Sequence, residues 1–242
     1  MAYYYNQQSG PKGLNNPVMS GDVQRSILKA YVWMFVGLLV TAAVSFGFLY
    51  MGGLNWMYYR APALFTFLPL VGLGIVIGFS FAMRSASPTT LKVLFLAYAV
   101  TLGINFTTFL ASYTPAEVCI SFLVCAVYFG SLVMIGLTTK RDLTGIGTIC
   151  LTALVVGLIG SFIFIIFRIS TSTWLISLLT LLIFTGLTAW DCQRINQIML
   201  QLQGQPDEQE RWAIYFALTL YLDFINIYIR ILSLIGRSNR RN

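Results

Sequence analysis

The 242-residue chain is 57% hydrophobic and only 10% charged, with a mean hydropathy of +0.77, whereas a soluble domain has about 25% charged residues. This composition excludes an ordinary soluble protein and predicts an integral membrane protein. The net charge of +7 is assigned to basic residues at helix ends, where they set orientation and meet anionic lipid, rather than to nucleic-acid binding. Because the chain has no His, we expect proton sensing to fall to carboxylates.

The chain alternates between a few polar segments and long apolar runs. Residues 1–24 are polar and predict a flexible tail, and residues 237–242 form a basic tail. An apolar run of about 20 residues is long enough to cross a bilayer as a helix. Such runs occupy residues 30–50, 62–83, 88–110, 115–137, 143–167, 172–190 and 212–235. We therefore predict an all-α integral membrane bundle of seven transmembrane helices within residues 25–236.

The basic residues beside these runs predict an orientation. One side of the membrane would hold Lys12, Arg25, Lys29, Arg84, Lys92, Lys140, Arg141, Arg194 and Arg211. This excess favours a cytoplasmic amino terminus. The basic carboxy-terminal tail conflicts with it, because seven spans would place that tail outside. Either the early loops dominate or the last segment is re-entrant, and we favour seven full spans.

An acid lies in the middle of the last apolar run, residues 217–232. Asp223 follows Trp212 by roughly 17 Å of helix, which is near the middle of a hydrocarbon core about 30 Å thick. An ionisable side chain at that depth is costly, so we expect it to face either the bundle interior or a water-filled cavity and to mark a functional site. Asn226 and Arg230 follow at helical spacing on roughly the same face. The structural alternative is a hydrogen-bonding centre formed with Asn226.

A second acid, Asp191, ends the sixth predicted span. Taken alone, it fits a side chain in water at the membrane interface. Taken with Asp223, it fits a buried pair, because consecutive antiparallel helices are usually neighbours. Two carboxyl groups in contact share a proton, and Arg84 on the same membrane side could neutralise whichever is charged. Counting along the helices separates the two acids by roughly 13 Å in depth, so the polar linker 192–211 would have to bring them together.

The pair suggests two kinds of chemistry. Calcium takes six to eight oxygen ligands, whereas two carboxylates supply only four, so Asp191 and Asp223 predict a weak, pH-sensitive calcium site and no tightly bound cofactor. Two aspartates on neighbouring helices could also hydrolyse peptides as acid and base. Intramembrane aspartyl proteases carry Tyr-Asp, Gly-x-Gly-Asp and a later Pro-Ala-Leu. The chain has neither Gly-x-Gly before Asp223 nor Pro-Ala-Leu after it, and we predict that it is not an enzyme.

Three runs together resemble the transmembrane Bax inhibitor motif family in its bacterial form: TTKRDLTGIGT, TGLTAWDCQRI and ALTLYLDFINIYIRIL. The resemblance covers about residues 25–236 and implies a seven-helix bundle with the last helix central. It also implies a pH-dependent calcium leak gated by two aspartates that match Asp191 and Asp223. Arg84 matches a basic residue that pairs with the first aspartate. Some bacterial relatives carry a carboxylate in the second helix, whereas residues 71–78 have none.

Two functional hypotheses follow. The first is a pH-sensitive calcium leak channel in the bacterial inner membrane, whose partners are the bilayer, calcium and protons and whose gating residues are Asp191, Asp223, Arg84 and Asn226. The second is a non-conducting interaction protein, because family members are described as inhibitors of a membrane-bound quality-control protease in bacteria and as survival factors in eukaryotes. Charge substitutions at the two aspartates would separate these hypotheses.

Overall fold

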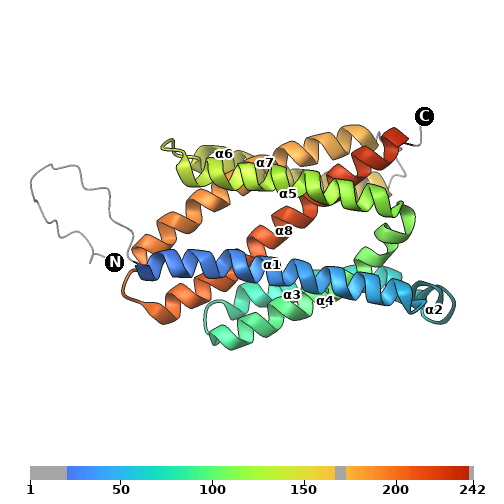
Figure 1. Cartoon of the computed structure of the whole chain (residues 1–242), viewed down its shortest axis with the longest axis horizontal. Helices are drawn as coiled ribbons and strands as arrows, with labels where there is room; N and C mark the ends of the chain where they lie inside the picture. Colours follow the sequence, from blue (N-terminus) through green and yellow to red (C-terminus); the bar gives the residue numbers. More distant parts are fainter. Residues whose placement is uncertain (1–20, 167–172, 240–242) are drawn as a thin grey trace, which may run out of the picture.

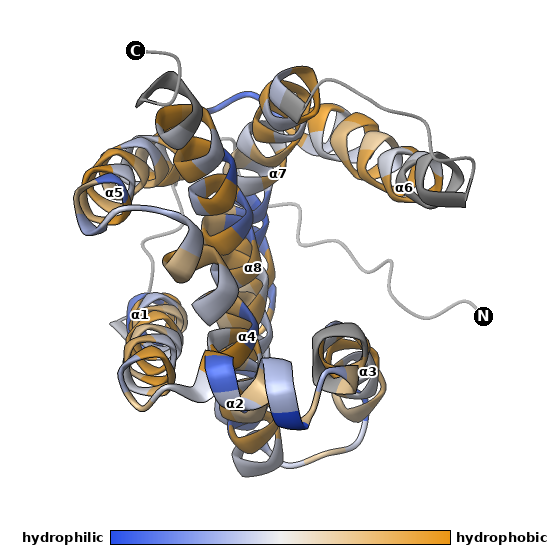
Figure 2. Cartoon of the chain, turned by 90° about the vertical axis from the view of Figure 1, so that its right-hand side faces the viewer, coloured by the Kyte–Doolittle hydropathy of each residue, from blue (hydrophilic) through white to orange (hydrophobic). Residues whose placement is uncertain are grey.

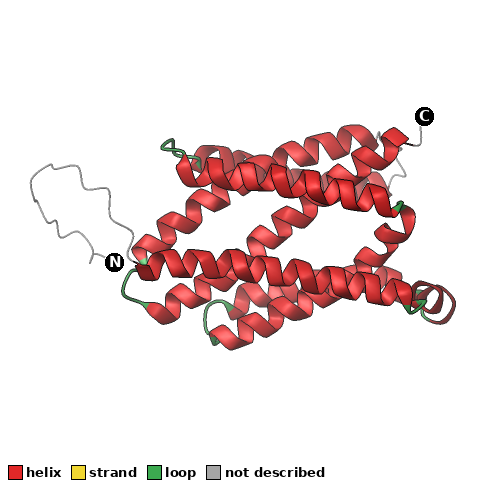
Figure 3. Ribbon diagram, viewed as in Figure 1, coloured by secondary structure: helices red, strands yellow, loops and turns green. Residues whose placement is uncertain are grey.

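A computed structural model describes residues 21–166 and 173–239 of the chain. Within these ranges all regular structure is helical (Figure 3). The helices are α1 (Gly21–Tyr50), α2 (Gly53–Arg60), α3 (Ala63–Ala82), α4 (Pro88–Ser112), α5 (Pro115–Thr138), α6 (Thr144–Ile166), α7 (Thr173–Gln201) and α8 (Pro206–Asn239). The predicted all-α class is confirmed. The short helix α2, which follows the left-handed Gly52 (φ 71°), was not predicted.

Several helices are long and apolar enough to cross a membrane. Within the described ranges there are five: Gly21–Tyr50, Pro88–Ser112, Pro115–Thr138, Trp174–Gln201 and Pro206–Gly236. Two apolar helices are shorter, Phe67–Ala82 and Thr144–Gly160. A membrane protein is thus supported, while the count of seven crossings stays a prediction.

Parts of the predicted segments lie outside the described residues. These parts are residues 1–20 of the polar tail, residues 167 and 172 at the ends of two predicted spans, and residues 240–242 of the basic tail.

Helix α8 lies at the centre of the bundle. It crosses obliquely between a group formed by α5, α6 and α7 and a group formed by α1, α3 and α4 (Figures 1 and 2). It packs against α1, α4, α5 and α7, whereas α3 packs mainly on α4 and α6 mainly on α7. Tyr221, Ile227 and Leu232 of α8 are completely buried. The central place that the resemblance implied for the last helix is therefore observed.

The outer surface of the bundle is apolar, as Figure 2 shows by the orange of its peripheral helices. Large apolar side chains point outward on three different helices, with Phe81 70%, Val127 76% and Ile149 71% exposed. Soluble proteins rarely expose wide apolar surfaces. This surface fits the hydrocarbon core of a membrane.

The polar linker predicted at 192–211 is wrong. Helix α7 continues to Gln201, and α8 begins at Pro206. The segment stays helical because Ile195 and Met199, one turn apart, are fully buried in a small apolar cluster with Phe216 of α8. Polar residues lie between Ile195 and Met199, so the segment is polar on average. It is nevertheless the amphipathic end of a helix, with its apolar side chains on one face.

A tight turn separates α7 from α8. Gly204 adopts a left-handed conformation (φ 87°), which favours glycine. Pro206 then starts α8, and the acidic residues Asp207 and Glu208 lie in its first turn, where the helix dipole favours negative charge. The turn makes α7 and α8 antiparallel neighbours.

The start of α8 is fixed to the other half of the bundle. Three side-chain contacts make this connection: Ser26 Oγ donates to Gln209 Oε1 (2.9 Å), Lys92 Nζ pairs with Glu210 Oε1 (2.5 Å), and Arg211 Nε donates to the carbonyl oxygen of Ala86 (2.9 Å). They join α8 to α1, to α4 and to the α3–α4 turn. The depth of α8 relative to its neighbours is thereby set.

Candidate functional site

Asp191 of α7 and Asp223 of α8 lie within hydrogen-bonding reach of each other in the bundle interior. They are only 5% and 4% exposed. The structure thus brings together the two acids that counting had placed at different depths. They meet because Asp191 lies well inside α7 rather than at its end, and because α8 crosses obliquely (Figure 1).

The surroundings of the pair supply few hydrogen-bond donors. Thr188, one turn before Asp191, lies within hydrogen-bonding reach of Asp223, but its hydroxyl donates to the carbonyl oxygen of Phe184 (2.7 Å). Among the described residues no donor reaches Asp223 Oδ2. Since burying an ionised carboxylate without donors is costly, a proton held between the two carboxyl groups satisfies this arrangement best.

The cation that acts on Asp191 is Arg194, one turn further along α7. Its guanidinium also lies 5.2 Å from the centre of the Trp190 ring, in a cation–π contact. Arg84, by contrast, is exposed in the turn between α3 and α4 and forms no ion pair with either aspartate. The predicted pairing of Arg84 with Asp191 is therefore not part of this geometry.

Asn226 is also apart from the pair. Its Nδ2 donates to the carbonyl oxygen of Leu222 within α8 (2.8 Å). Arg230, further along the helix, is half-buried, and its Nε lacks a hydrogen-bond partner. The shared helical face therefore joins neither Asn226 nor Arg230 to Asp223 by a hydrogen bond.

Sequence reasoning missed two neighbours of the pair. The hydroxyl of Tyr31 on α1 faces the thiol of Cys192 on α7, and that thiol lies close to both aspartates. Cys192 is completely buried. Helical spacing from Asp191 could have identified Thr188 and Arg194, but no sequence pattern pointed to Tyr31.

Two further contacts hold the part of α7 that carries Asp191. Gln193 bridges the α5–α6 loop, because its Oε1 accepts from the Leu143 amide and its Nε2 donates to the Arg141 carbonyl, both at 2.8 Å. Helix α5 also approaches α7 closely at Gly136, where an added Cβ would lie 2.5 Å from the carbonyl oxygen of Ala189. The backbone around Asp191 is thus held by α5 and by the α5–α6 loop.

The site offers few ligands for a metal ion. In the described ranges, no three or more His, Cys, Asp or Glu side chains gather where they could hold one. The pair supplies at most four carboxylate oxygens, fewer than the six to eight that calcium prefers. The two carboxyl groups alone therefore do not complete a calcium shell of the usual size.

Comparison with known proteins agrees with this architecture. The family model described as inhibitor of apoptosis-promoting Bax1 matches residues 23–240. The inner membrane protein YbhL of Escherichia coli K12 is 30% identical over 220 residues, covering 90% of this chain and 93% of that protein. An uncharacterised protein of Deinococcus radiodurans is 36% identical over 219 residues, covering 90% and 92% of the two chains. The all-helical membrane protein with its central last helix therefore belongs to the Bax inhibitor family.

Proposed function

We propose that the protein is a pH-sensitive calcium leak channel of a bacterial inner membrane, with Asp191 and Asp223 as its gate. The observation that carries this proposal is the buried contact of two carboxyl groups between the central helix and its neighbour. Membership of the Bax inhibitor family supports a membrane function, and the printed name of the E. coli relative supports the inner membrane.

The gate works through one shared proton. While the proton is held, a hydrogen bond joins α7 to α8 and the route beside α8 is closed. When pH rises and the proton leaves, two like charges face each other away from water and repel. Helices α7 and α8 then separate, so the leak rises with pH.

Charged neighbours tune this step. Arg194 already acts on Asp191, so it stabilises that carboxylate once the pair has separated. Arg84 would take part only in a state in which the α3–α4 turn moves toward α7. Calcium passing between the separated carboxylates completes its shell with water and with the amide oxygen of Asn226, which explains why a tight site is unnecessary.

The topology that goes with this function has seven crossings. The five long helices supply five of them, and the shorter apolar helices within α3 and α6 supply the other two. We place the amino terminus in the cytoplasm, because Lys29, Arg84 and Lys140 then lie on the cytoplasmic side. On this assignment the start of α8, with its fixed contacts, also lies on that side.

Calcium flux into proteoliposomes tests the gate. Wild-type protein is expected to leak increasingly as pH rises from about 5 to about 8, because the shared proton is lost. Asp223→Asn and Asp191→Asn each leave a single carboxyl group in the pair, which can still form a hydrogen bond to the Asn side chain. Because the shared proton and the repulsion between two carboxylates are both lost, the flux of either variant should respond much less to pH than that of the wild type.

Asp142→Asn is the matched control. Hydrogen bonds from the Thr144 hydroxyl and amide lower the pKa of the exposed Asp142 carboxyl, which therefore stays ionised throughout the experiment. This variant should respond to pH like the wild type. Absence of flux at every pH from well-folded protein, or a normal pH response in both Asn variants of the pair, would contradict the proposal.

A non-conducting interaction protein is the second candidate. It is favoured by the peripheral position of α3 and α6, each of which packs mainly on one neighbour and presents an apolar outer face. Another membrane protein, such as a quality-control protease, would bind there. In this case crosslinking to the partner should be unaffected by Asp223→Asn, and no flux should be found.

A further inference from the structure

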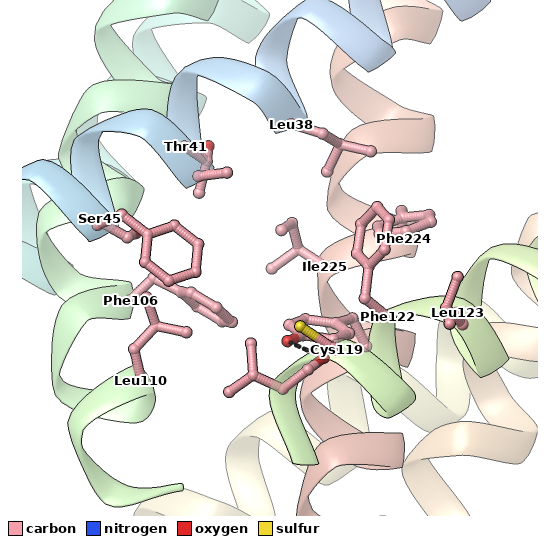
Figure 4. A pocket seen from close by; sticks show the side chains of 14 residues that line it. Leu38, Thr41, Ser45, Phe106, Leu110, Cys119, Phe122, Leu123, Phe224 and Ile225 are labelled. Atoms are coloured by element: carbon pink, nitrogen blue, oxygen red, sulfur yellow. Dashed lines mark hydrogen bonds between the residues drawn. The ribbon is translucent and has the colours of Figure 1, made fainter. Parts of the chain in front are cut away.

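A cavity of about 410 Å³ lies between α1 and α5, away from the aspartate pair. Side chains from α1, α4, α5 and α8 surround the space (Figure 4). Phe224 and Ile225 of α8 line its inner part and are 5% exposed each. Toward the outside it is lined by Phe46 and Leu123, which are 55% and 65% exposed. The cavity therefore opens sideways on the apolar outer surface of the bundle.

The lining offers almost no polar group to a ligand. Thr41 Oγ1 donates to the carbonyl oxygen of Ala99 (3.1 Å), and Ser45 Oγ donates to that of Gly103 (2.6 Å). The hydroxyl of Tyr228 is likewise used, by the carbonyl oxygen of Val118; their distance is 3.2 Å. The remaining polar lining group is the thiol of Cys119, a weak donor.

We propose that this lateral cavity holds an acyl chain of a membrane phospholipid. A space lined by apolar side chains does not hold water well, because water needs two to four polar partners. The opening faces the membrane hydrocarbon, so lipid chains are the apolar groups at hand to enter it. The volume of about 410 Å³ is well over twice that of an apolar cavity of about 150 Å³ that holds a benzene ring, so it leaves room for a stretch of acyl chain.

The bound chain lies directly against the gate helix. Phe224 and Ile225 follow Asp223 on α8, so an acyl chain in the cavity packs on the side of α8 opposite to the carboxyl pair. The chain therefore contacts α8 beside the ring contacts that Phe122 and Phe129 of α5 make with Phe224.

Photocrosslinking tests the site. The protein is reconstituted with phosphatidylcholine that carries a diazirine on one acyl chain, then diluted into unlabelled lipid and illuminated after increasing delays. Adducts are mapped by mass spectrometry at Phe122, which lines the cavity, and at Val127, which is 76% exposed on the same helix outside it. A bound chain exchanges slowly, so adducts at Phe122 should persist after those at Val127 have disappeared.

Two adjacent alanines of α1 provide a matched pair of variants. Ala42 lines the cavity, whereas Ala43 is exposed outside it. Ala42→Phe should reduce labelling at Phe122 on the order of tenfold, equivalent to about 1.4 kcal/mol, whereas Ala43→Phe should leave it unchanged.

The dilution experiment on wild-type protein tests the proposal even if Ala42→Phe folds poorly. Equal loss of adducts at Phe122 and Val127 would show only bulk lipid in the cavity and overturn the proposal. So would undiminished labelling at Phe122 in a folded Ala42→Phe variant.

Discussion

Asp223 and Phe224 are consecutive residues of α8, yet they face opposite surroundings. Asp223 faces α7, where a carboxyl, a hydroxyl and a thiol lie close together. Phe224 faces the lateral cavity, where hydroxyl groups are used up by backbone carbonyl groups. Helix α8 thus separates the aspartate pair, where a change of charge should matter most, from the lateral cavity, where a change of side-chain size should matter most. The two sides should be independent in energy, and the following substitutions test how far this holds.

Gly136→Ala should have the largest effect on stability. The added methyl group would lie 2.5 Å from the carbonyl oxygen of Ala189, so α5 and α7 must move apart at the charged side. Overpacking of this kind costs about 1–3 kcal/mol, measured by thermal unfolding in detergent. Gly130 is also in α5, and a Cβ there would meet nothing within 4 Å. Gly130→Ala should therefore be neutral or slightly stabilising, and a similar loss in both variants would argue against a specific clash.

The carboxyl pair should show strong coupling in a double-mutant cycle. Residues in contact couple by about 0.5–3 kcal/mol, whereas independent sites add within about 0.3–0.5 kcal/mol. We expect the first range for Asp191→Asn with Asp223→Asn, and the second for Asp223→Asn with Ala42→Phe. Strong coupling in the second cycle would mean that the two sides of α8 act as one unit.

Tyr221→Phe should cost about 0.5–1.5 kcal/mol, the usual net value of one hydrogen bond. The Tyr221 hydroxyl lies 2.6 Å from Thr41 Oγ1, and its ring contacts Phe95 edge to face at 5.5 Å. The substitution removes the first contact and keeps the second. Tyr98→Phe is the control, because no side-chain hydrogen bond involves the Tyr98 hydroxyl within the described residues. Equal melting temperatures for the two variants would show that the Thr41 contact contributes little.

The smallest effect is expected for Lys92→Met. The ion pair with Glu210 is partly open to solvent, at 27% and 33% side-chain exposure, and such pairs contribute about 0.2–1 kcal/mol. Because salt screens exposed charges, the difference in melting temperature from wild type should shrink at high ionic strength. A difference that does not change with salt would instead point to packing of the Lys92 side chain over the Trp33 ring.

The all-α membrane class and the burial of Asp223 could both be predicted from the sequence. Asp223 lies within a long apolar run, and a run of that length is typical of a membrane helix. The sequence could not decide between the interfacial and the paired interpretation of Asp191, since that choice depends on how α7 and α8 cross. Local spacing could have favoured Arg194 over Arg84 as the cation near Asp191. The role of Tyr31 could not be predicted from the sequence, because its place beside Cys192 depends on the packing of α1 against α7.

The central position of α8 also has a consequence for biosynthesis. A chain emerges from the ribosome amino terminus first, so the helices that surround α8 are made before it. Until α8 inserts, the limited contact between α1 and α7 is the main link between the group of α1 and α4 and the group of α5 and α7. A nascent chain that stops before Pro206 therefore lacks the middle of its bundle rather than an edge. Completion of the last helix is the step that joins two half-assembled groups into one protein.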